Sequence, residues 1–315
     1  MTMWEQNLKP LVVCNRASGS FDDTAEHWDA LRTLDARIVE IDRETDLVGL
    51  IEEALQTGFN TVVAAGGDGT VNAVVNAVMA MNAGQRPRMA ILPLGTANDF
   101  AGTLCIPDNI NEAVELLRHG RCLPIDVIRI RAEGFEMHYA NVAAGGNSVR
   151  VTEEITSEMK SRWGAFCYLR GALTVLTDLE SYRIDVALDD EYIEQMDTWA
   201  VLVANGKTNA GRIVVAPGAS PVDGLMDVIL IRDGSVLDMM DIVGNAMLGN
   251  YLESEQVIHR QVKHLQLDSR PDMRFTVDGE VIDQQPVVFD VVPAAIEMFI
   301  GDDFRDPAGT VRVPV

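Results

Sequence analysis

The sequence has few cysteines, and their spacing fits neither a metal site nor a disulfide framework. Its four cysteines, Cys14, Cys105, Cys122 and Cys167, are scattered with no C-x-x-C pattern. Scattered cysteines of this kind are typical of reduced thiols in a cytoplasmic protein. The first residues, MTMWEQNLKPLVV, also lack the basic flank and small-residue cleavage site of a secretory signal. These absences predict a cytoplasmic protein.

Long hydrophobic runs and positive charge are also scarce. No window contains eighteen apolar residues, so no transmembrane helix is expected. There are 25 lysines and arginines against 48 aspartates and glutamates, which gives a formal net charge of −23. This excess argues against nucleic-acid binding and against adsorption to an anionic membrane through overall charge. With 315 residues, 47% of them hydrophobic, the chain is long enough for two globular domains.

Several common catalytic and nucleotide-binding motifs are missing. No G-x-G-x-x-G follows a predicted strand, and there is no H-E-x-x-H or G-x-S-x-G. The stretch 205–208, NGKT, resembles the tail of a P-loop, but Val201 stands where that motif requires its first glycine. The sequence therefore predicts neither a Rossmann dinucleotide fingerprint nor a P-loop.

The first part of the chain alternates predicted strands with predicted helices, which is typical of a doubly wound, mostly parallel sheet. The expected strands are 8–15, 36–42, 60–65 and 88–95, and the expected helices are 25–34, 45–58, 70–82, 96–104 and 109–120. Thr45 or Asp46 is expected to cap the second helix. Asn109 or Asn111 is expected to cap the last of these helices.

From Pro124 onward, short segments of alternating hydrophobicity predict a mainly antiparallel β-sandwich. The expected strands are 125–132, 135–145, 182–190, 198–205, 224–232, 262–269, 273–282 and 286–293, interrupted by helices at 162–179 and 236–251. We therefore predict an α/β nucleotide-binding domain over 1–125 and a β-sandwich domain over 126–294. The segment 295–315 is expected to return to the first domain.

A glycine-rich turn follows the predicted strand 60–65: Gly66, Gly67, Asp68, Gly69 and Thr70. Such a turn places backbone N–H groups at the start of a helix, where they bind phosphate. The alternative is an ordinary tight turn of a doubly wound domain. Asp68 favours the functional interpretation, because a carboxylate beside phosphates needs a cation such as Mg²⁺ between them.

A second polar turn, PLGTANDFA, follows the next predicted strand at residues 93–101. Thr96 could donate a hydrogen bond to phosphate, and Asp99 could hold a metal ion through water. The alternative is a helix start at which Asn98 or Asp99 serves as the N-cap. Ligands bind at the carboxyl ends of strands in such sheets, so the two turns are expected to line one crevice.

Three segments in this order, NRASGS, GGDGTVNAVVNAV and PLGTANDFA, resemble the diacylglycerol kinase catalytic family, including its bacterial lipid-kinase branch. Looser matches extend the resemblance over nearly the whole chain: IDVIRI, NVAAGG, KSRWGAFCYLRGALTVL, VLVANG, IVVAPGASPVDGLMDV and FTVDGEVI. The resemblance implies an ATP- and Mg²⁺-dependent kinase that phosphorylates a hydroxyl of diacylglycerol or a related lipid. Its active site would lie in the cleft between the two domains.

The resemblance also implies roles for individual residues. Glu280 would be the general base, and Asp68 and Asp99 would organise the catalytic Mg²⁺ region. The residues implied to contact ATP are Asn15, Ser18, Gly19, Gly66, Gly67, Asp68, Gly69, Thr70, Val71, Asn72, Ala73 and Thr96. A structural Mg²⁺ would be held by the carboxylate of Asp223 and the backbone carbonyls of Ser220 and Leu225.

The implied partner is a membrane lipid, reached by peripheral contact with the inner face of the membrane. The sequence leaves open whether the protein forms a homodimer. Residues 160–176 could rest at the membrane interface or could pack on the sandwich. Two alternatives to a lipid kinase remain. One is a kinase with a soluble substrate such as NAD, which PLGTANDF argues against. The other is a weakened nucleotide- or lipid-binding protein, because Ala73 stands where the family usually has glutamate and Val222 where it often has aspartate.

Overall fold

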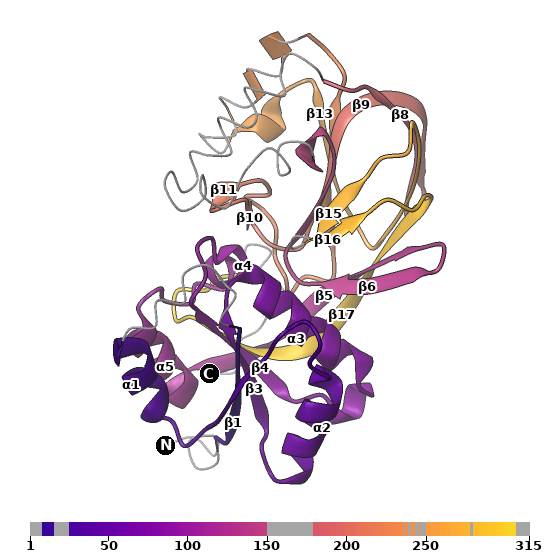
Figure 1. Ribbon diagram of the computed structural model, residues 1–315. Helices are drawn as coiled ribbons and strands as arrows, with labels where there is room; N and C mark the ends of the chain where they lie inside the picture. The colour runs from indigo at the N-terminus through magenta and orange to yellow at the C-terminus, as the bar shows by residue number, and fades with distance from the viewer. Residues whose placement is uncertain are drawn as a thin grey trace.

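The computed structural model describes residues 8–15, 25–149, 179–235, 250–277 and 280–306, together with isolated positions between 237 and 245. The chain forms two parts, an α/β part drawn in indigo and purple and a β-rich part above it (Figure 1). No helix in the described ranges is long and apolar enough to cross a membrane.

Four parallel strands form the sheet of the α/β part, in the order β2-β1-β3-β4. The strands are β1 (Pro10–Cys14), β2 (Arg37–Glu40), β3 (Thr61–Gly66) and β4 (Arg88–Pro93). The helices are α1 (Ala25–Arg32), α2 (Leu47–Gln56), α3 (Asp68–Ala80), α4 (Asp99–Thr103) and α5 (Ile110–His119), with a short 3₁₀ turn at Ala83–Gln85. Every residue of β1 and β3 is buried, which is the pattern of strands covered on both faces.

Side-chain caps decide where two of these helices begin. Asp46 accepts a hydrogen bond from the backbone N–H of Gly49 at 3.0 Å, so it is the N-cap of α2. Asn109 accepts bonds from the first-turn N–H groups of α5, so it is the N-cap there. Helix α3 begins two residues earlier than the sequence predicts. The carbonyl of Gly67 already accepts from the N–H groups of Thr70 and Val71, which makes Asp68 the first helical residue.

The β-rich part is antiparallel, as the sequence predicts. Its strands are β6 (Phe135–Tyr139), β7 (Val142–Gly146), β8 (Tyr182–Leu188), β9 (Glu191–Ala204), β10 (Thr208–Asn209), β11 (Ile213–Val214), β12 (Met226–Arg232), β13 (Val257–Val262), β14 (His264–Arg270), β15 (Phe275–Val277) and β16 (Glu280–Ile282), with a 3₁₀ turn at Tyr251–Glu253. The predicted segment 135–145 divides into β6 and β7. Strand β13 and the short β10–β11 hairpin were not predicted. The predicted helix 162–179 lies almost wholly outside the described residues, and most of 236–251 does as well.

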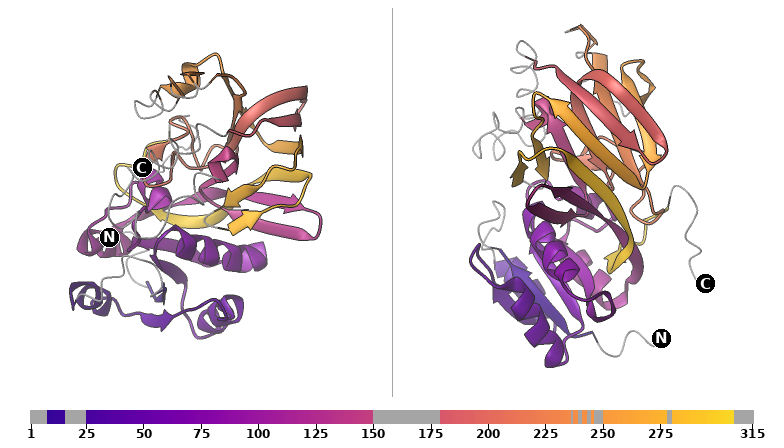
Figure 2. Two further views of the ribbon diagram at one scale, coloured as in Figure 1. Left: turned by 45° about the horizontal axis from the view of Figure 1, so that its top comes forward. Right: turned by 90° about the vertical axis from the view of Figure 1, so that its right-hand side faces the viewer.

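Two long strands run through both parts. Strand β5 (Arg121–Ala132) pairs antiparallel with β17 (Val287–Ile300), and Met298 of β17 pairs in parallel with Met89 of β4. Figure 2 shows β17 in yellow descending from the sandwich beside the α/β part. The sequence predicts that this strand ends at Pro293, but in the structure the strand continues to Ile300. The register shifts between Val292 and Ile296, which is the kind of irregularity where a sheet tolerates proline.

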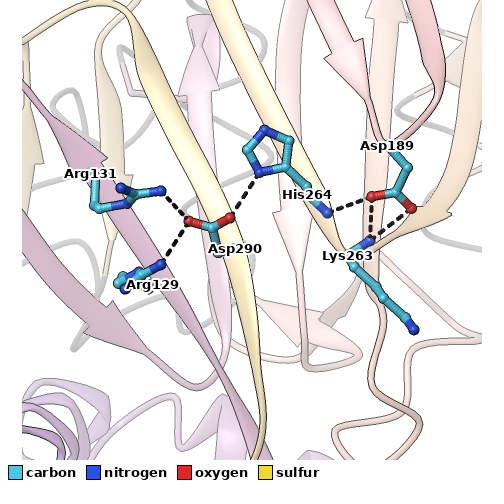
Figure 3. A network of polar contacts seen from close by, with 6 residues as sticks. All are labelled: Arg129, Arg131, Asp189, Lys263, His264 and Asp290. Carbon is cyan, nitrogen blue, oxygen red and sulfur yellow. Dashed lines mark hydrogen bonds and ion pairs between the residues drawn. The ribbon is translucent and has the colours of Figure 1, made fainter.

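An ion-pair network ties three of these strands together on one surface (Figure 3). Asp290 of β17 accepts hydrogen bonds from Arg129 and Arg131 of β5 and contacts the ring of His264 on β14 at 2.8 Å. Asp189 accepts the backbone N–H groups of Lys263 and His264 at the start of β14. Burial alone would raise the pKa of Asp290. The hydrogen bonds from His264, Arg131 and Arg129 outweigh burial and lower the pKa below its ordinary value.

The lowered pKa of Asp290 predicts a pH-dependent contribution to stability. We expect Asp290→Asn to lower the free energy of unfolding by about 1–3 kcal/mol at pH 7, because charge-assisted bonds are lost at a partly exposed site. An aspartate with a depressed folded pKa stabilises above its unfolded pKa and loses that effect as the pH falls through the folded one. Urea unfolding should therefore give a difference between wild type and variant that shrinks as the pH falls below about 4. A difference that does not shrink below that pH would contradict this.

Candidate active site

The two predicted turns lie against each other at the ends of neighbouring strands. Strands β3 and β4 pair in parallel to their last residues, with Gly66 opposite Pro93. The N–H of Leu94 donates to the carbonyl of Gly66 at 3.0 Å. A Cβ atom added to Gly67 would lie 3.2 Å from the Cα of Gly95, so the two backbones are in contact. The prediction that both turns line one crevice is consistent with this contact.

Asn98 shapes the second turn. Its backbone is left-handed, with a φ of 52°, and it precedes α4 without making a side-chain cap bond. Its side-chain oxygen instead accepts from the N–H of Gly95 at 2.9 Å, and its amide nitrogen donates to the carbonyls of Pro93 and Gly95. Asn98 therefore occupies the N-cap position of α4, but its side chain does not cap the helix. Asn98 closes the turn that brings Gly95 against Gly67.

The contact between the two turns predicts that Gly95→Ala is damaging. A Cβ at position 95 would collide with the Cα of Gly67, which is backbone and cannot rotate away. We expect a loss of about 1–3 kcal/mol in the free energy of unfolding, because the turns must separate. Chemical unfolding measures this loss.

Gly102→Ala is the matched control for this substitution. A Cβ at Gly102, in the helix that follows the same turn, meets nothing within 4 Å. Since alanine favours helix more than glycine does, Gly102→Ala should be neutral or slightly stabilising. Equal losses for both substitutions in chemical unfolding would show that the contact between the turns is unimportant.

Two carboxylates meet where these turns end. Asp68 begins α3 and accepts a hydrogen bond from the backbone N–H of Phe100 at 3.3 Å. Asp99 begins α4 and is buried. Burial raises the pKa of Asp68, and the negative charge of Asp99 raises it further. Two neighbouring acids of this kind favour a bound cation, which would relieve both effects.

Asp99 is held by the β-rich part of the molecule. Its carboxylate accepts the backbone N–H of Gly211 at 3.0 Å and that of Arg212 at 2.5 Å, both from the tip of the β10–β11 hairpin. The sequence predicts a metal-organising role for Asp99 but contains no signal for these contacts. The structure thus joins the two parts of the chain directly at a predicted site residue.

A small pocket lies beside Asp68 at the boundary between the two parts. It is a narrow crevice, too tight for a water molecule in this structure, and it is lined by Asp68, Val71, Asn72, Phe100, Ala140 and Asn141. The first four residues come from α3 and α4, and the last two precede β7. Ala73, which stands where the family usually has glutamate, is exposed on α3 and does not line this pocket.

Glu280 lies at the start of the edge strand β16 and is exposed. It pairs with Val277 of β15, and Val277 in turn pairs with Ala143 of β7. This register aligns Glu280 with the end of β7 that follows Asn141, and β15 lies between Glu280 and β7. Figure 1 shows β15 and β16 in the lower part of the sandwich, toward the α/β part.

Comparison with known proteins decides the family. Residues 9–130 match the family described as "Diacylglycerol kinase catalytic domain", and residues 140–300 match the "YegS C-terminal NAD kinase beta sandwich-like domain". The chain belongs to the diacylglycerol kinase catalytic family. This lipid kinase is 32% identical over 299 residues to "Probable lipid kinase YegS-like" of Pectobacterium atrosepticum, covering 93% of this chain and 96% of that one. It is 30% identical over 254 residues to "Diacylglycerol kinase" of Staphylococcus epidermidis, covering 80% and 78%.

Solved structures bear out the fold of this lipid kinase. A "putative diacylglycerol kinase" from Bacillus anthracis has a TM-score of 0.78 at 24% identity, covering 94% of this chain and 96% of that one. An NAD kinase from Archaeoglobus fulgidus, solved with ATP, has a TM-score of 0.52 at 15% identity and similar coverage. The predicted combination of an α/β domain with a β-sandwich domain is therefore confirmed, as are the family and the kinase class.

The residues implied to contact ATP lie in three places in this lipid kinase. Asn15 follows β1 and is half-buried, and Thr96 is exposed in the second turn. Ser18 and Gly19 lie outside the described residues. The remaining positions run through the end of β3 and the first turns of α3: Gly66, Gly67, Asp68, Gly69, Thr70, Val71, Asn72 and Ala73. Of these, Asp68, Val71 and Asn72 line the pocket.

The predicted structural Mg²⁺ loop precedes β12. Burial and the charges of neighbouring aspartates raise the pKa of Asp223 to about 6. Asp126 of β5 accepts the backbone N–H groups of Gly224 and Ala294, each at 2.7 Å, so it ties this loop to β17. Among the described residues, no group of three histidines, cysteines or acids is arranged to hold a metal ion. A site with one carboxylate and the carbonyls of Ser220 and Leu225 is a different arrangement, and it stays a prediction.

Val222, which stands where the family often has a second aspartate, packs against the hydrophobic core of the α/β part. Sequence reasoning did not identify Asp126 as a residue that supports this loop. Its only signal was an aspartate inside an apolar strand, Ile125–Asp126–Val127, where a buried charge is costly unless it is hydrogen-bonded.

Proposed function

We propose that this lipid kinase transfers the terminal phosphate of ATP to a hydroxyl of diacylglycerol or a related lipid, with Mg²⁺ and with Glu280 as the general base. The observation that carries the proposal is the contact between the two glycine turns beside the carboxylates of Asp68 and Asp99. The strand register adds support, because Val277 and Glu280 pair at the end of β7 that follows Asn141, a residue of the pocket.

The first turn of α3 supplies the proposed phosphate site. Gly67 precedes the helix without a side-chain cap, so the backbone N–H groups of the first turn point out of the helix end. These donors and the helix dipole favour a phosphate group. The close contact with Gly95 keeps side chains away from this helix end, which lets a phosphate approach the backbone.

Asp68 and Asp99 fit a magnesium ion by their chemistry, because Mg²⁺ prefers carboxylate oxygen and water. When bound, Mg²⁺ neutralises charge on the phosphates in phosphoryl transfer. Asp68 would hold the ion beside the pocket. Asp99, whose carboxylate already accepts two backbone N–H groups, would act through water. The raised pKa of Asp68 supports this assignment, because a neighbouring cation would favour its charged form.

Glu280 would take the proton of the acceptor hydroxyl. An alcohol is a weak nucleophile at neutral pH, and a carboxylate within hydrogen-bond reach speeds its attack. The exposed position of Glu280 on an edge strand would leave room for a bulky lipid acceptor. Such an acceptor lies in a membrane, so we infer a cytoplasmic enzyme of phospholipid metabolism in peripheral contact with the inner face of the membrane.

The two alternative functions have less support. The NAD kinase likeness is low in identity and concerns the fold alone. A weakened binding protein was suggested by the missing glutamate, but the exposed Ala73 does not line the pocket beside Asp68. The identity of the phosphate acceptor therefore distinguishes a lipid kinase from a kinase with a soluble substrate.

A label-transfer assay tests this proposal. The protein is incubated with Mg²⁺ and γ-labelled ATP, separately with diacylglycerol in mixed micelles and with NAD. We expect label in the organic phase with diacylglycerol and none on NAD. Label on NAD would establish the soluble-substrate alternative. Nucleotide binding without any transfer would establish the weakened protein.

A further inference from the structure

The β10–β11 hairpin has an unusual backbone at its tip. Ala210, Gly211 and Arg212 have consecutive positive φ angles of 57°, 86° and 71°. Alanine and arginine rarely adopt this conformation, which costs each of them roughly 1–2 kcal/mol. A chain retains such strain only where surrounding contacts offset it. Successive N–H groups in such a turn also form a concave nest that binds an anion.

The anion in this nest is the carboxylate of Asp99. Gly211 donates to one of its oxygens and Arg212 donates to the other. Two further bonds join the same segment to α4. The hydroxyl of Thr208 donates to the backbone carbonyl of Asp99 at 3.2 Å, and the N–H of Lys207 donates to the hydroxyl of Thr103 at 3.0 Å. The hairpin is therefore bound by hydrogen bonds to helix α4 of the α/β part.

An ion pair adds a further contact between the hairpin and the α/β part. The guanidinium of Arg212 pairs with Asp108, which lies between α4 and α5. This hydrogen bond raises the pKa of Arg212, and the charges of Asp99 and Asp68 add to it. Arg212 thus contacts the α/β part twice, with its backbone at Asp99 and with its side chain at Asp108.

We propose that the β10–β11 hairpin is a clasp that fixes the orientation of Asp99, and that Arg212 is a positioning residue that keeps the clasp closed through Asp108. The inference rests on the proposed function for its catalytic consequence, because it assigns Asp99 a place in phosphoryl transfer. The clasp itself does not depend on that function. Through the clasp, the β-rich part holds a carboxylate of the α/β part.

The test combines amide hydrogen exchange with kinetics in the full-length protein. In Arg212→Ala and in Asp108→Asn, the backbone N–H groups at positions 211 and 212 should exchange about three- to fivefold faster, the effect of losing an exposed ion pair. The double variant should exchange no faster than either single variant. The kcat should fall about threefold with little change in KM for ATP, because a looser clasp misplaces Asp99. Arg212→Lys should keep the exchange rate and the kcat close to those of wild type.

Two further variants keep the test decisive. Arg260→Ala breaks a comparably exposed pair with Glu191 in the sandwich and should change neither quantity. Arg212→Gly removes the side chain but suits the positive φ. If it exchanges as slowly as wild type, backbone conformation and not the ion pair closes the clasp, and the role of Arg212 is refuted. Wild-type exchange in Arg212→Ala and Asp108→Asn would refute it as well. Faster exchange in a protein that phosphorylates no lipid would leave the clasp standing while the proposed function fails.

Discussion

Asp68→Asn is expected to lower the kcat for lipid phosphorylation about a thousandfold, because it removes a charge that the proposed mechanism assigns to the Mg²⁺ region. The substitution keeps the size of the side chain, and its amide oxygen can still accept from the N–H of Phe100. Steady-state rates with γ-labelled ATP and diacylglycerol measure the effect.

Asp68→Asn should also leave the protein at least as stable as wild type. Burial and Asp99 raise the pKa of Asp68, so its charged form destabilises the folded state at neutral pH. A charge that costs stability and is retained is typical of a functional site. Asp197→Asn, at an exposed carboxylate paired with Arg183, is the control and should retain full activity. Inactivity that accompanies a lower unfolding midpoint would indicate misfolding and not a catalytic role.

Glu280→Gln has the second large expected effect. Loss of a general base lowers kcat by about 10²- to 10⁴-fold. The KM for ATP should change little, because Glu280 lies on the β15–β16 hairpin and not on the phosphate turns. The same assay measures both constants over a range of ATP concentrations.

Glu280 is exposed, so Glu280→Gln should change the free energy of unfolding by less than about 0.5 kcal/mol. Glu191→Gln, at another exposed strand glutamate, serves as the control and should behave like wild type. A Glu280→Gln variant with full kcat would sink the assignment of the base while leaving the kinase family intact.

Local sequence patterns predict the α/β part well. The strand–turn–helix order and the caps at Asp46 and Asn109 depend on residues close together in the chain. The apolar runs of β1 and β3 correctly indicate strands covered on both faces. The start of α3 was placed too late, because Asp68 reads as a turn residue when the carbonyl of Gly67 is not considered.

Long-range contacts explain what the sequence could not predict. Strands β10 and β11 have two residues each, too few for an alternating pattern, yet their hairpin holds Asp99. Strand β17 reads as two segments because of Pro293, but its pairing with β5 and β4 keeps it continuous. The alignment of Glu280 with the start of β7 depends on the register through β15, which no local feature of its own segment specifies.

A crystal structure with Mg²⁺ and a non-hydrolysable ATP analogue tests the central claim most directly. We expect the terminal phosphate at the first turn of α3, between Gly67 and Thr96, with the metal ion beside Asp68. We also expect the transferred phosphate to face the β-rich part, which carries Glu280. A nucleotide bound away from the contact between the two glycine turns, or a metal ion remote from Asp68, would contradict it.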